Sequence, residues 1–176
     1  MNSMYPKKSS ASKTPSKASS PPAAPARGKR IQVRKSGIHG KGVFALAPIA
    51  AGERIMEYTG SVITWKEAQR RHPHDPNDPD HTFFFHIDDK RVIDGALNGN
   101  SAKWINHACG PNCEADLDEE AGRVFINALH DISPGEELNY DYGLILEGRH
   151  TAKVKKQFEC RCGTPECRST MLAPKR

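Results

Sequence analysis

Three cysteines near the end of the chain have the spacing of metal ligands. Cys160, Cys162 and Cys167 stand within eight residues on a segment rich in turn formers. This spacing lets one chain wrap three thiolates around a tetrahedral zinc ion, which needs a fourth ligand. Cys109 and Cys113 are both candidates, and either would attach the C-terminal segment to the middle of the chain. The alternative is a set of reduced structural cysteines or an incidental disulfide.

Two further segments carry polar groups suited to binding or catalysis. In segment 103–113, Asn106 and His107 can donate and accept hydrogen bonds beside apolar neighbours. Tyr140 and Tyr142 are two residues apart, so on a strand both hydroxyls would face the same side. An Asn-His pair is also typical of a satisfied turn, and paired tyrosines are typical of sheet packing. Each motif alone therefore leaves its role open.

Two charged clusters are weaker candidates. The loop at 72–81 holds histidines and aspartates that could bind a metal ion, but its three prolines favour a solvated loop or the wall of a peptide groove. The acidic residues in 114–120 could attract a basic substrate. An exposed hairpin turn explains them more simply.

Short strands are predicted to position these residues. One helix is expected to begin after Thr64, whose hydroxyl has capping-box spacing to the Glu67 carboxylate, and to end before Pro73. A short helical turn is expected near 101–105. Strands are expected in the β-prone runs near 31–33, 43–47, 54–58, 82–88, 91–94, 113–117 and 124–129. This pattern predicts a β-rich α+β fold.

Charge divides the chain near residue 30. Residues 1–30 contain seven basic and no acidic residues, which leaves 19 basic and 21 acidic residues in the remainder. This Ser/Pro/Ala/Lys-rich tail cannot bury enough apolar surface to fold, so disorder is predicted. It is suited to solubilise the protein, to make weak contacts with nucleic acid or chromatin, or to serve as a substrate of the protein's own activity. The predicted domains are this tail, a folded domain at 31–146 and a cysteine-rich segment at 147–176.

Composition excludes several classes of protein. Hydrophobic residues make up 36% of the chain, charged residues 27%, and the mean hydropathy is −0.68, as in soluble domains. No apolar run approaches the ~20 residues that span a bilayer. The chain is too short for a barrel enzyme. Without a secretory apolar segment it is expected to stay inside the cell, in a nucleus on chromatin or in a bacterial cytoplasm or nucleoid.

Together the motifs resemble a SET-domain protein lysine methyltransferase followed by a cysteine-rich post-SET segment. The resemblance covers roughly residues 30 to 172, with the motifs in the family's order. They are SGIHGKGVFA at 36–45, EYTG at 57–60, FFFHID at 83–88, DGALNG at 94–99, NH at 106–107 with PNC at 111–113, GEELNYDYG at 135–143, and the terminal cysteines.

The resemblance implies transfer of a methyl group from S-adenosylmethionine to the ε-amine of a protein lysine. Cofactor and peptide would meet through a narrow channel, and a pseudoknot would pass the Tyr142 segment beneath the loop that contains Asn106. The implied catalytic residues are Tyr142 and Tyr140. The implied cofactor contacts are His39, Gly40, Lys41, Gly42, Phe83, Asn106, His107 and Tyr142. The implied zinc ligands are Cys109, Cys160, Cys162 and Cys167.

The channel has a physical task that can be stated independently of the family. Lysine titrates near 10.4, and an apolar aromatic channel lowers that pKa because burial disfavours the ammonium. Tyrosine hydroxyls and backbone carbonyls can then aim the amine at the methyl donor. Family members have Phe or Tyr at the position of Tyr140, and a tyrosine there tends to hold a water beside the amine, so mono- or dimethylation is predicted.

Departures from the family pattern keep rival functions open. Phe83 stands where many members carry a channel tyrosine, which favours the alternative of a non-catalytic chromatin or nucleic-acid-binding module with the same fold. A metal hydrolase using the 72–81 loop is a third class, but it lacks an organised ligand set. The expected partner of the enzyme is a basic protein such as a histone or a histone-like DNA-binding protein. No membrane partner is expected.

Overall fold

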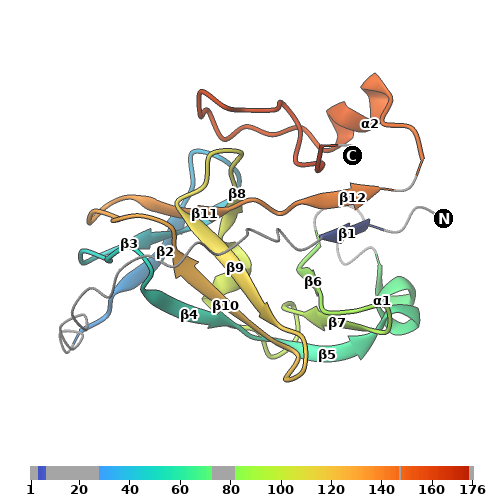
Figure 1. Cartoon of the computed structure of the whole chain (residues 1–176), viewed down its shortest axis with the longest axis horizontal. Coiled ribbons are helices and arrows are strands. Elements are labelled where there is room, and N and C mark those ends of the chain that lie inside the picture. Colours follow the sequence, from blue (N-terminus) through green and yellow to red (C-terminus); the bar gives the residue numbers. More distant parts are fainter. Residues whose placement is uncertain (1–3, 7–27, 73–81, 147, 175–176) are drawn as a thin grey trace, which may run out of the picture.

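Short strands separated by turns make up most of the computed structural model, which describes residues 4–6, 28–72, 82–146 and 148–174 (Figure 1). In chain order the elements are β1 (Met4–Pro6), β2 (Ile31–Lys35), β3 (Lys41–Ala45), β4 (Arg54–Tyr58), β5 (Ser61–Thr64), α1 (Trp65–Arg71), β6 (Phe84–His86), β7 (Arg91–Asp94), the 3₁₀ turn η1 (Ser101–Trp104), β8 (Asn106–His107), β9 (Cys113–Asp118), β10 (Arg123–Ala128), β11 (Glu137–Tyr140), β12 (Leu144–Leu146) and α2 (Ala152–Gln157).

The described strands form small sheets rather than one large one. Their orders are β2-β3-β11-β8, β4-β10-β9, β5-β7-β6 and β1-β12. Neighbours run antiparallel except for β8 and β11, which are parallel. The predicted β-rich α+β class is confirmed, and the hairpin expected after Cys113 is the β9–β10 pair.

One apolar core joins the larger sheets. Strand β10 shows how the sequence builds it: Val124, Ile126 and Ala128 are buried, because alternate residues of a strand face the same side. Val43 of β3 and Leu138 of β11 are fully buried in the same cluster. The core therefore lies directly behind β11, the strand that leads to Tyr142.

Helix α1 begins where the sequence predicted. The Thr64 side chain accepts a hydrogen bond from the backbone N–H of Glu67 (3.2 Å). The second half of the predicted capping box is wrong, because the Glu67 carboxylate accepts hydrogen bonds from Arg70 (2.7 Å) and Arg71 (2.6 Å) instead. Hydrogen bonds from charged guanidinium groups are stronger than the bond from the neutral backbone N–H of Thr64 that a capping box would use. The rest of the proline-rich loop, residues 73–81, lies outside the described residues.

The strand that carries Tyr140 ends earlier than expected. β11 stops at Tyr140, so the two tyrosines do not share a strand. The Asp141 side chain accepts a hydrogen bond from the backbone N–H of Gly143 (3.0 Å), and Gly143 has a φ of +55°. An aspartate that bonds to the backbone two residues on forms a turn, which ends the ladder here.

The structure describes two parts of the N-terminal tail, residues 4–6 and 28–30. Met4–Pro6 forms β1, which pairs with β12, because an edge strand offers unpaired backbone groups. At the other end the Arg30 guanidinium forms an ion pair with Glu53 and donates to the Pro48 carbonyl (2.8 Å). Residues 7–27 lie outside the described part of the chain.

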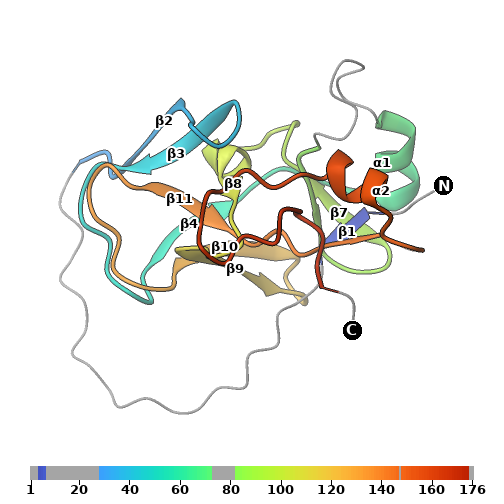
Figure 2. The same ribbon diagram turned by 90° about the horizontal axis from the view of Figure 1, so that it is seen from above.

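The C-terminal segment folds back over the middle of the chain. Figure 2 shows it, in red, passing the region of β8 and β10 after α2. A second small apolar cluster of Leu146, Phe158 and Leu172 holds its ends together, and Leu144 forms an isolated parallel bridge with Leu172. Within the described ranges, no helix combines the length and apolar character needed to cross a bilayer.

The position of Leu138 generates a stability prediction. Leu138→Ala removes a fully buried side chain from β11 and should lower the free energy of unfolding by about 2–5 kcal/mol. The matched control is Leu129→Ala, because the Leu129 side chain is 46% exposed and its loss should change the free energy by less than about 0.5 kcal/mol. Urea unfolding measures both values, and equal effects would contradict the placement of the core.

Candidate functional site

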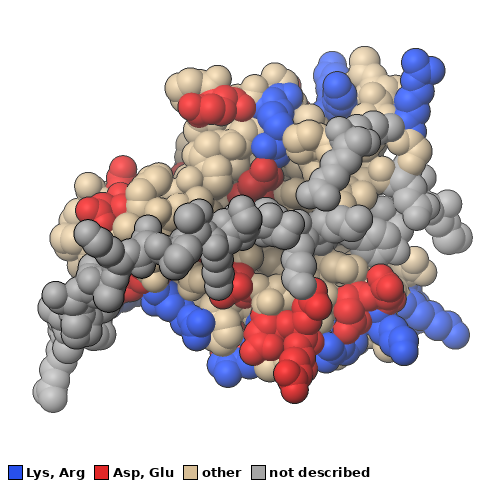
Figure 3. Space-filling view, in the orientation of Figure 1, with Lys and Arg blue, Asp and Glu red and all other residues tan. Residues whose placement is uncertain are grey.

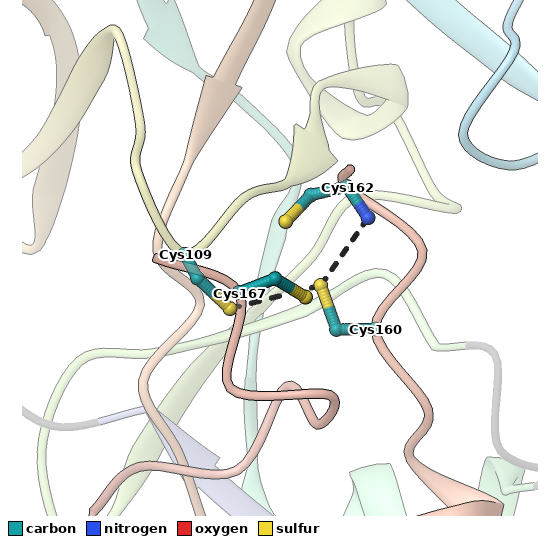
Figure 4. A group of neighbouring side chains, drawn as sticks. All are labelled: Cys109, Cys160, Cys162 and Cys167. Carbon is teal, nitrogen blue, oxygen red and sulfur yellow. Dashed lines mark hydrogen bonds between the residues drawn. The ribbon is translucent and has the colours of Figure 1, made fainter. Parts of the chain in front are cut away.

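Four cysteines from two distant segments converge into one cluster (Figure 4). The Sγ atoms of Cys109, Cys160, Cys162 and Cys167 all lie within 4.8 Å of one another. The Sγ atoms of Cys109 and Cys160 are 3.7 Å apart, close to the ~3.8 Å edge of a tetrahedron with Zn–S bonds of ~2.3 Å. Four thiols in this arrangement suit a single soft metal ion.

Backbone N–H groups around the cluster favour thiolates. The N–H of Cys162 donates to Cys160 Sγ (3.4 Å), that of Arg168 to Cys109 Sγ (3.3 Å) and that of Ser169 to Cys167 Sγ (3.4 Å). Burial opposes ionisation of the Cys162 thiol, but hydrogen bonds from the Cys109 backbone and from Thr164 outweigh it and lower its pKa to about 6. For Cys109 and Cys160 burial is the stronger influence and raises the pKa of the thiol.

Cys113 is separate from this cluster. It is fully buried at the start of β9, in the main core, and burial raises the pKa of its thiol to about 12. Of the two candidates that the sequence left for the fourth thiol, the structure brings Cys109 to the other three.

The glycine-containing turn at 39–42 is fixed against β8. The Asn106 side-chain amide donates to the backbone carbonyls of His39 (3.2 Å) and Lys41 (2.9 Å). Gly40 has a φ of +45°, in the left-handed region that glycine tolerates best. At Gly42 the constraint is different, since a Cβ there would push against the Glu137 carboxylate and force that side chain to shift.

The Glu137 carboxylate connects three segments that are distant in sequence. It accepts hydrogen bonds from Ser36 Oγ (2.7 Å), before the turn, and from Asn106 Nδ2 (2.7 Å), on β8. Glu137 itself begins β11, whose Asn139 pairs with Asn106 in parallel register. The loop after β8 is also tied to β11, because Asn112 and Asn139 exchange backbone and side-chain hydrogen bonds (2.9 and 3.0 Å).

His107 lies between the tyrosine segment and the thiols. Its Nδ1 accepts a hydrogen bond from the backbone N–H of Tyr142 (3.1 Å), and its Nε2 is 3.4 Å from Cys109 Sγ. Burial lowers the pKa of His107 to about 4. The Asp141 carboxylate acts in the opposite direction, and the positive charge of Arg168 lowers the pKa further. The ring is therefore neutral at pH 7, and since Nδ1 accepts, the proton is on Nε2 and faces the sulfur.

An aromatic cluster, Phe85, Tyr140 and Tyr142, surrounds the end of β11. The ring centroids of Tyr140 and Tyr142 are 4.9 Å apart, and those of Phe85 and Tyr140 are 6.3 Å apart. The Tyr142 hydroxyl donates to the Ile105 carbonyl (2.8 Å), which fixes its direction. Burial raises the pKa of Tyr140 and of Tyr142 above the usual value, so both hydroxyls stay protonated at neutral pH.

Phe83 lies near this cluster and forms a second aromatic pair with Trp104. Its ring meets that of Trp104 edge to face at 5.0 Å, and the Tyr58 hydroxyl donates to its carbonyl (2.8 Å). Lys41 Nζ lies 4.6 Å from the centroid of the Trp104 ring, so this ring face already holds a cation. The rings therefore connect Phe83 to the glycine-containing turn.

An ion pair links the C-terminal segment to the tyrosine segment. Both terminal guanidinium nitrogens of Arg168, Nη1 and Nη2, donate to the Asp141 carboxylate (2.8 and 2.9 Å). This two-point geometry fixes the relative orientation of the two side chains. Asp141 lies next to Tyr142, and the backbone of Arg168 bonds to Cys109 Sγ, so the pair connects the thiols and the tyrosine segment by a second route.

The structure thus brings the residues singled out in the sequence into one region. The turn at 39–42, the Asn106-His107 pair, the two tyrosines and Phe83 adjoin one another, and the four thiols lie next to His107. Sequence reasoning missed the linking residues Ser36, Glu137, Asp141 and Arg168. The only signal for Glu137 was its place in the motif at 135–143, because its partner Ser36 is 101 residues away.

Comparison with known proteins finds relatives whose sequences align with most of this chain. It is 37% identical over 145 residues to a histone-lysine N-methyltransferase of Candida albicans, described as specific for H3 lysine-4, and 37% identical over 148 residues to the histone-lysine N-methyltransferase set1 of Dictyostelium discoideum. It is 37% identical over 147 residues to the histone-lysine N-methyltransferase ATX2 of Arabidopsis thaliana. These alignments cover 81%, 82% and 81% of this chain.

The relatives are far longer than this chain. The aligned regions are 14%, 10% and 13% of the three relatives in the same order. The family model described as the SET domain matches residues 40–143, which is more than half of the chain and includes residues 40–42 of the glycine-containing turn, Asn106, His107 and both tyrosines. The chain belongs to the SET domain family.

Proposed function

We propose that this chain is an S-adenosylmethionine-dependent protein lysine N-methyltransferase that acts on a basic protein, a histone or a histone-like DNA-binding protein. The observation that carries the proposal is the position of Tyr142, whose hydroxyl is directed by Ile105 and whose ring adjoins Tyr140. The relatives' names as histone-lysine methyltransferases support the substrate class. The proposed domains are 31–146 for the catalytic unit and 147–176 for the cysteine-rich segment.

The aromatic cluster supports the proposal because a lysine must be neutral to accept a methyl group. Burial that raises the pKa of the tyrosine hydroxyls would lower that of an amine, since both shifts favour the uncharged form. The backbone carbonyl of Ile105 and the Tyr142 hydroxyl are polar groups at the edge of the cluster that can align the amine. Alignment of this kind can contribute several kcal/mol to the lowering of a barrier.

The residues around the 39–42 turn fit S-adenosylmethionine. When bound, this cofactor supplies a methyl group already activated on a sulfonium. Asn106 and His107 are buried polar groups beside the turn, and Asn106 already bonds to its backbone, so both can contribute hydrogen bonds to a polar cofactor. His39, Gly40, Lys41 and Gly42 would contribute backbone groups, and Phe83 and Tyr142 would contribute ring surface.

An exposed acidic surface supports a basic partner. On β9 the alternating residues Glu114, Asp116 and Asp118 are exposed, because period-two alternation puts them on the solvent face. Figure 3 shows acidic side chains, in red, near the middle of the lower edge of this face of the molecule, with basic side chains, in blue, on either side of them. A surface of this sign attracts lysine-rich segments such as histone tails. We place the protein accordingly on chromatin or a nucleoid, where the basic N-terminal tail would add weak contacts with nucleic acid.

The thiol cluster is proposed to bind one structural zinc ion through Cys109, Cys160, Cys162 and Cys167. Purified chain should contain one zinc per molecule by inductively coupled plasma mass spectrometry. Cys167→Ser should lose most of this zinc, and chelation should lower the free energy of unfolding by several kcal/mol, roughly as in other small zinc-held segments. Cys113→Ser is the matched control and should keep one zinc, so a loss there would contradict the ligand set.

Tyr142→Phe tests the proposed activity. With labelled S-adenosylmethionine and mixed histones or nucleoid proteins, wild type should label lysines, and the variant should be slower by about 10²-fold because it loses a directed hydroxyl. Tyr58→Phe is the control for stability, since it also loses one hydrogen bond to a carbonyl at 2.8 Å. Both variants should unfold within about 1.5 kcal/mol of wild type. Tight cofactor binding by wild type without transfer would instead support the non-catalytic module.

Tyr140 is proposed to limit the number of methyl groups added. Tyr140 is 7% exposed and its ring is tilted against that of Tyr142, so its hydroxyl would take up space next to an amine held by Tyr142. Wild type should therefore produce mono- and dimethyllysine, and Tyr140→Phe should shift the product towards trimethyllysine. Mass spectrometry of a methylated substrate peptide measures the distribution, and an unchanged distribution would refute the assignment.

A further inference from the structure

The orientation of the Asn106 amide is set by the groups around its nitrogen. Asn106 Nδ2 lies 3.2 Å from the His39 carbonyl, 2.9 Å from the Lys41 carbonyl and 2.7 Å from Glu137 Oε1. Carbonyls and ionised carboxylates can only accept hydrogen bonds, so all three groups require a donor at this end of the amide. A rotation that exchanged the oxygen and the nitrogen would place an oxygen against three acceptors. The nitrogen of Asn106 therefore faces the turn and the carboxylate.

The Ser36 hydroxyl shows that the Glu137 carboxylate acts as an acceptor. Its oxygen accepts hydrogen bonds from the backbone N–H groups of Ile38 (2.9 Å) and His39 (3.4 Å). Its single proton is directed to Glu137, whose carboxylate oxygens are 2.7 and 2.9 Å away. Hydrogen bonds to a charged acceptor are the stronger kind. Among the three acceptors around Asn106 Nδ2, Glu137 is both the nearest and the charged one, so it contributes most to the orientation of the amide.

The position of the Glu137 carboxylate is restricted from two directions. The Glu137 carbonyl accepts hydrogen bonds from the side-chain amides of Asn112 (2.9 Å) and Asn139 (3.2 Å), which fix the backbone. The side chain lies against Gly42, where an added Cβ would force the carboxylate to shift. The carboxylate therefore has little freedom to move away from Asn106.

The oxygen of the Asn106 amide is the group left for a ligand. Asn106 is 8% exposed, and within the described ranges no group donates a hydrogen bond to its Oδ1. An acceptor on a mostly buried side chain gains from a ligand that supplies a donor. S-adenosylmethionine has such donors in its ammonium group, its ribose hydroxyls and its adenine amino group.

We propose that Glu137 is a positioning residue for the cofactor, which holds the nitrogen of the Asn106 amide towards the turn and so presents Oδ1 to a donor group of S-adenosylmethionine. The proposal rests on the proposed methyltransferase function and adds a residue to its cofactor site. Glu137 acts through Asn106, so its substitution should change the affinity for the cofactor more than the rate of transfer from bound cofactor.

The test exchanges the two groups that meet. Titration calorimetry of the full chain with S-adenosylhomocysteine measures affinity without turnover. Glu137→Gln should weaken binding by about fivefold, because a neutral amide replaces a charged acceptor. Asn106→Asp should weaken it by about 10²-fold, because a second carboxylate then faces that of Glu137. In the Asn106→Asp chain, Glu137→Gln should instead strengthen binding by about tenfold, since the new amide can donate to the new carboxylate.

This reversal of sign separates positioning from damage to the fold, because two substitutions that only destabilise the chain would weaken binding further when combined. Glu136→Gln is the matched control, since Glu136 is exposed one residue earlier and its change should leave the affinity within about twofold in both chains. If Glu137→Gln weakens binding in both chains, or changes it in neither, the proposal is wrong.

Gly42 gives a second test, which does not require the Asn106→Asp chain to fold. Gly42→Ala adds a Cβ that displaces the Glu137 carboxylate, so it should weaken binding of S-adenosylhomocysteine by about tenfold. In a Glu137→Ser chain the shorter side chain leaves room for this Cβ, and Gly42→Ala should change the affinity by less than about twofold. Equal effects of Gly42→Ala in the two chains would overturn the proposal.

Kinetics with S-adenosylmethionine and histone H3 separate this proposal from the proposed function. Glu137→Gln should raise KM for the cofactor by about fivefold and change kcat at saturating cofactor by less than about twofold. A fall in kcat with unchanged KM, in a wild type that binds S-adenosylhomocysteine and methylates H3, overturns the positioning role alone. A wild type that neither binds S-adenosylhomocysteine nor methylates H3 overturns the proposed function as well.

Discussion

The site depends on the pairing of β11 with two strands at once. Leu138 pairs with Val43 on β3, and Asn139 pairs with Asn106 on β8. Because buried backbone N–H and C=O groups must be paired, β11 cannot slip along one neighbour without losing bonds to the other. A slip of one residue would also turn Leu138 out of the core. The register of β11 therefore sets where the chain delivers Tyr142.

Burial gives this region a consistent preference for uncharged groups. It lowers the pKa of His107 and raises those of Tyr140 and Tyr142, and each shift favours the neutral form. Two acids adjoin this region, and both have partners: Glu137 accepts hydrogen bonds from Ser36 and Asn106, and Asp141 pairs with Arg168. The same environment that orders the aromatic cluster would thus remove the charge from an amine placed there.

Local patterns in the sequence predicted the parts that depend on neighbouring residues. The alternation of apolar and polar residues predicted β10, and the Thr64 hydroxyl predicted the start of α1. The cysteine spacing predicted three of the four clustered thiols. The contacts that assemble the site are not local. Ser36 and Glu137 are 101 residues apart and Asp141 and Arg168 are 27 apart, and no periodicity encodes such pairs. The family resemblance supplied the combination of motifs, and the structure supplied the residues that join them.

The end of the strand at Tyr140 shows why the distant contacts matter. Tyr142 lies beyond the ladder, so no strand partner fixes it. Its position is set instead by His107, which accepts its backbone N–H and faces Cys109, and by the ion pair of Asp141 with Arg168. Both routes lead to the thiol cluster. A displacement of about 1 Å can slow a reaction that depends on alignment by about 10²-fold. Because the C-terminal segment fixes the position of Tyr142, it is a part of the candidate site.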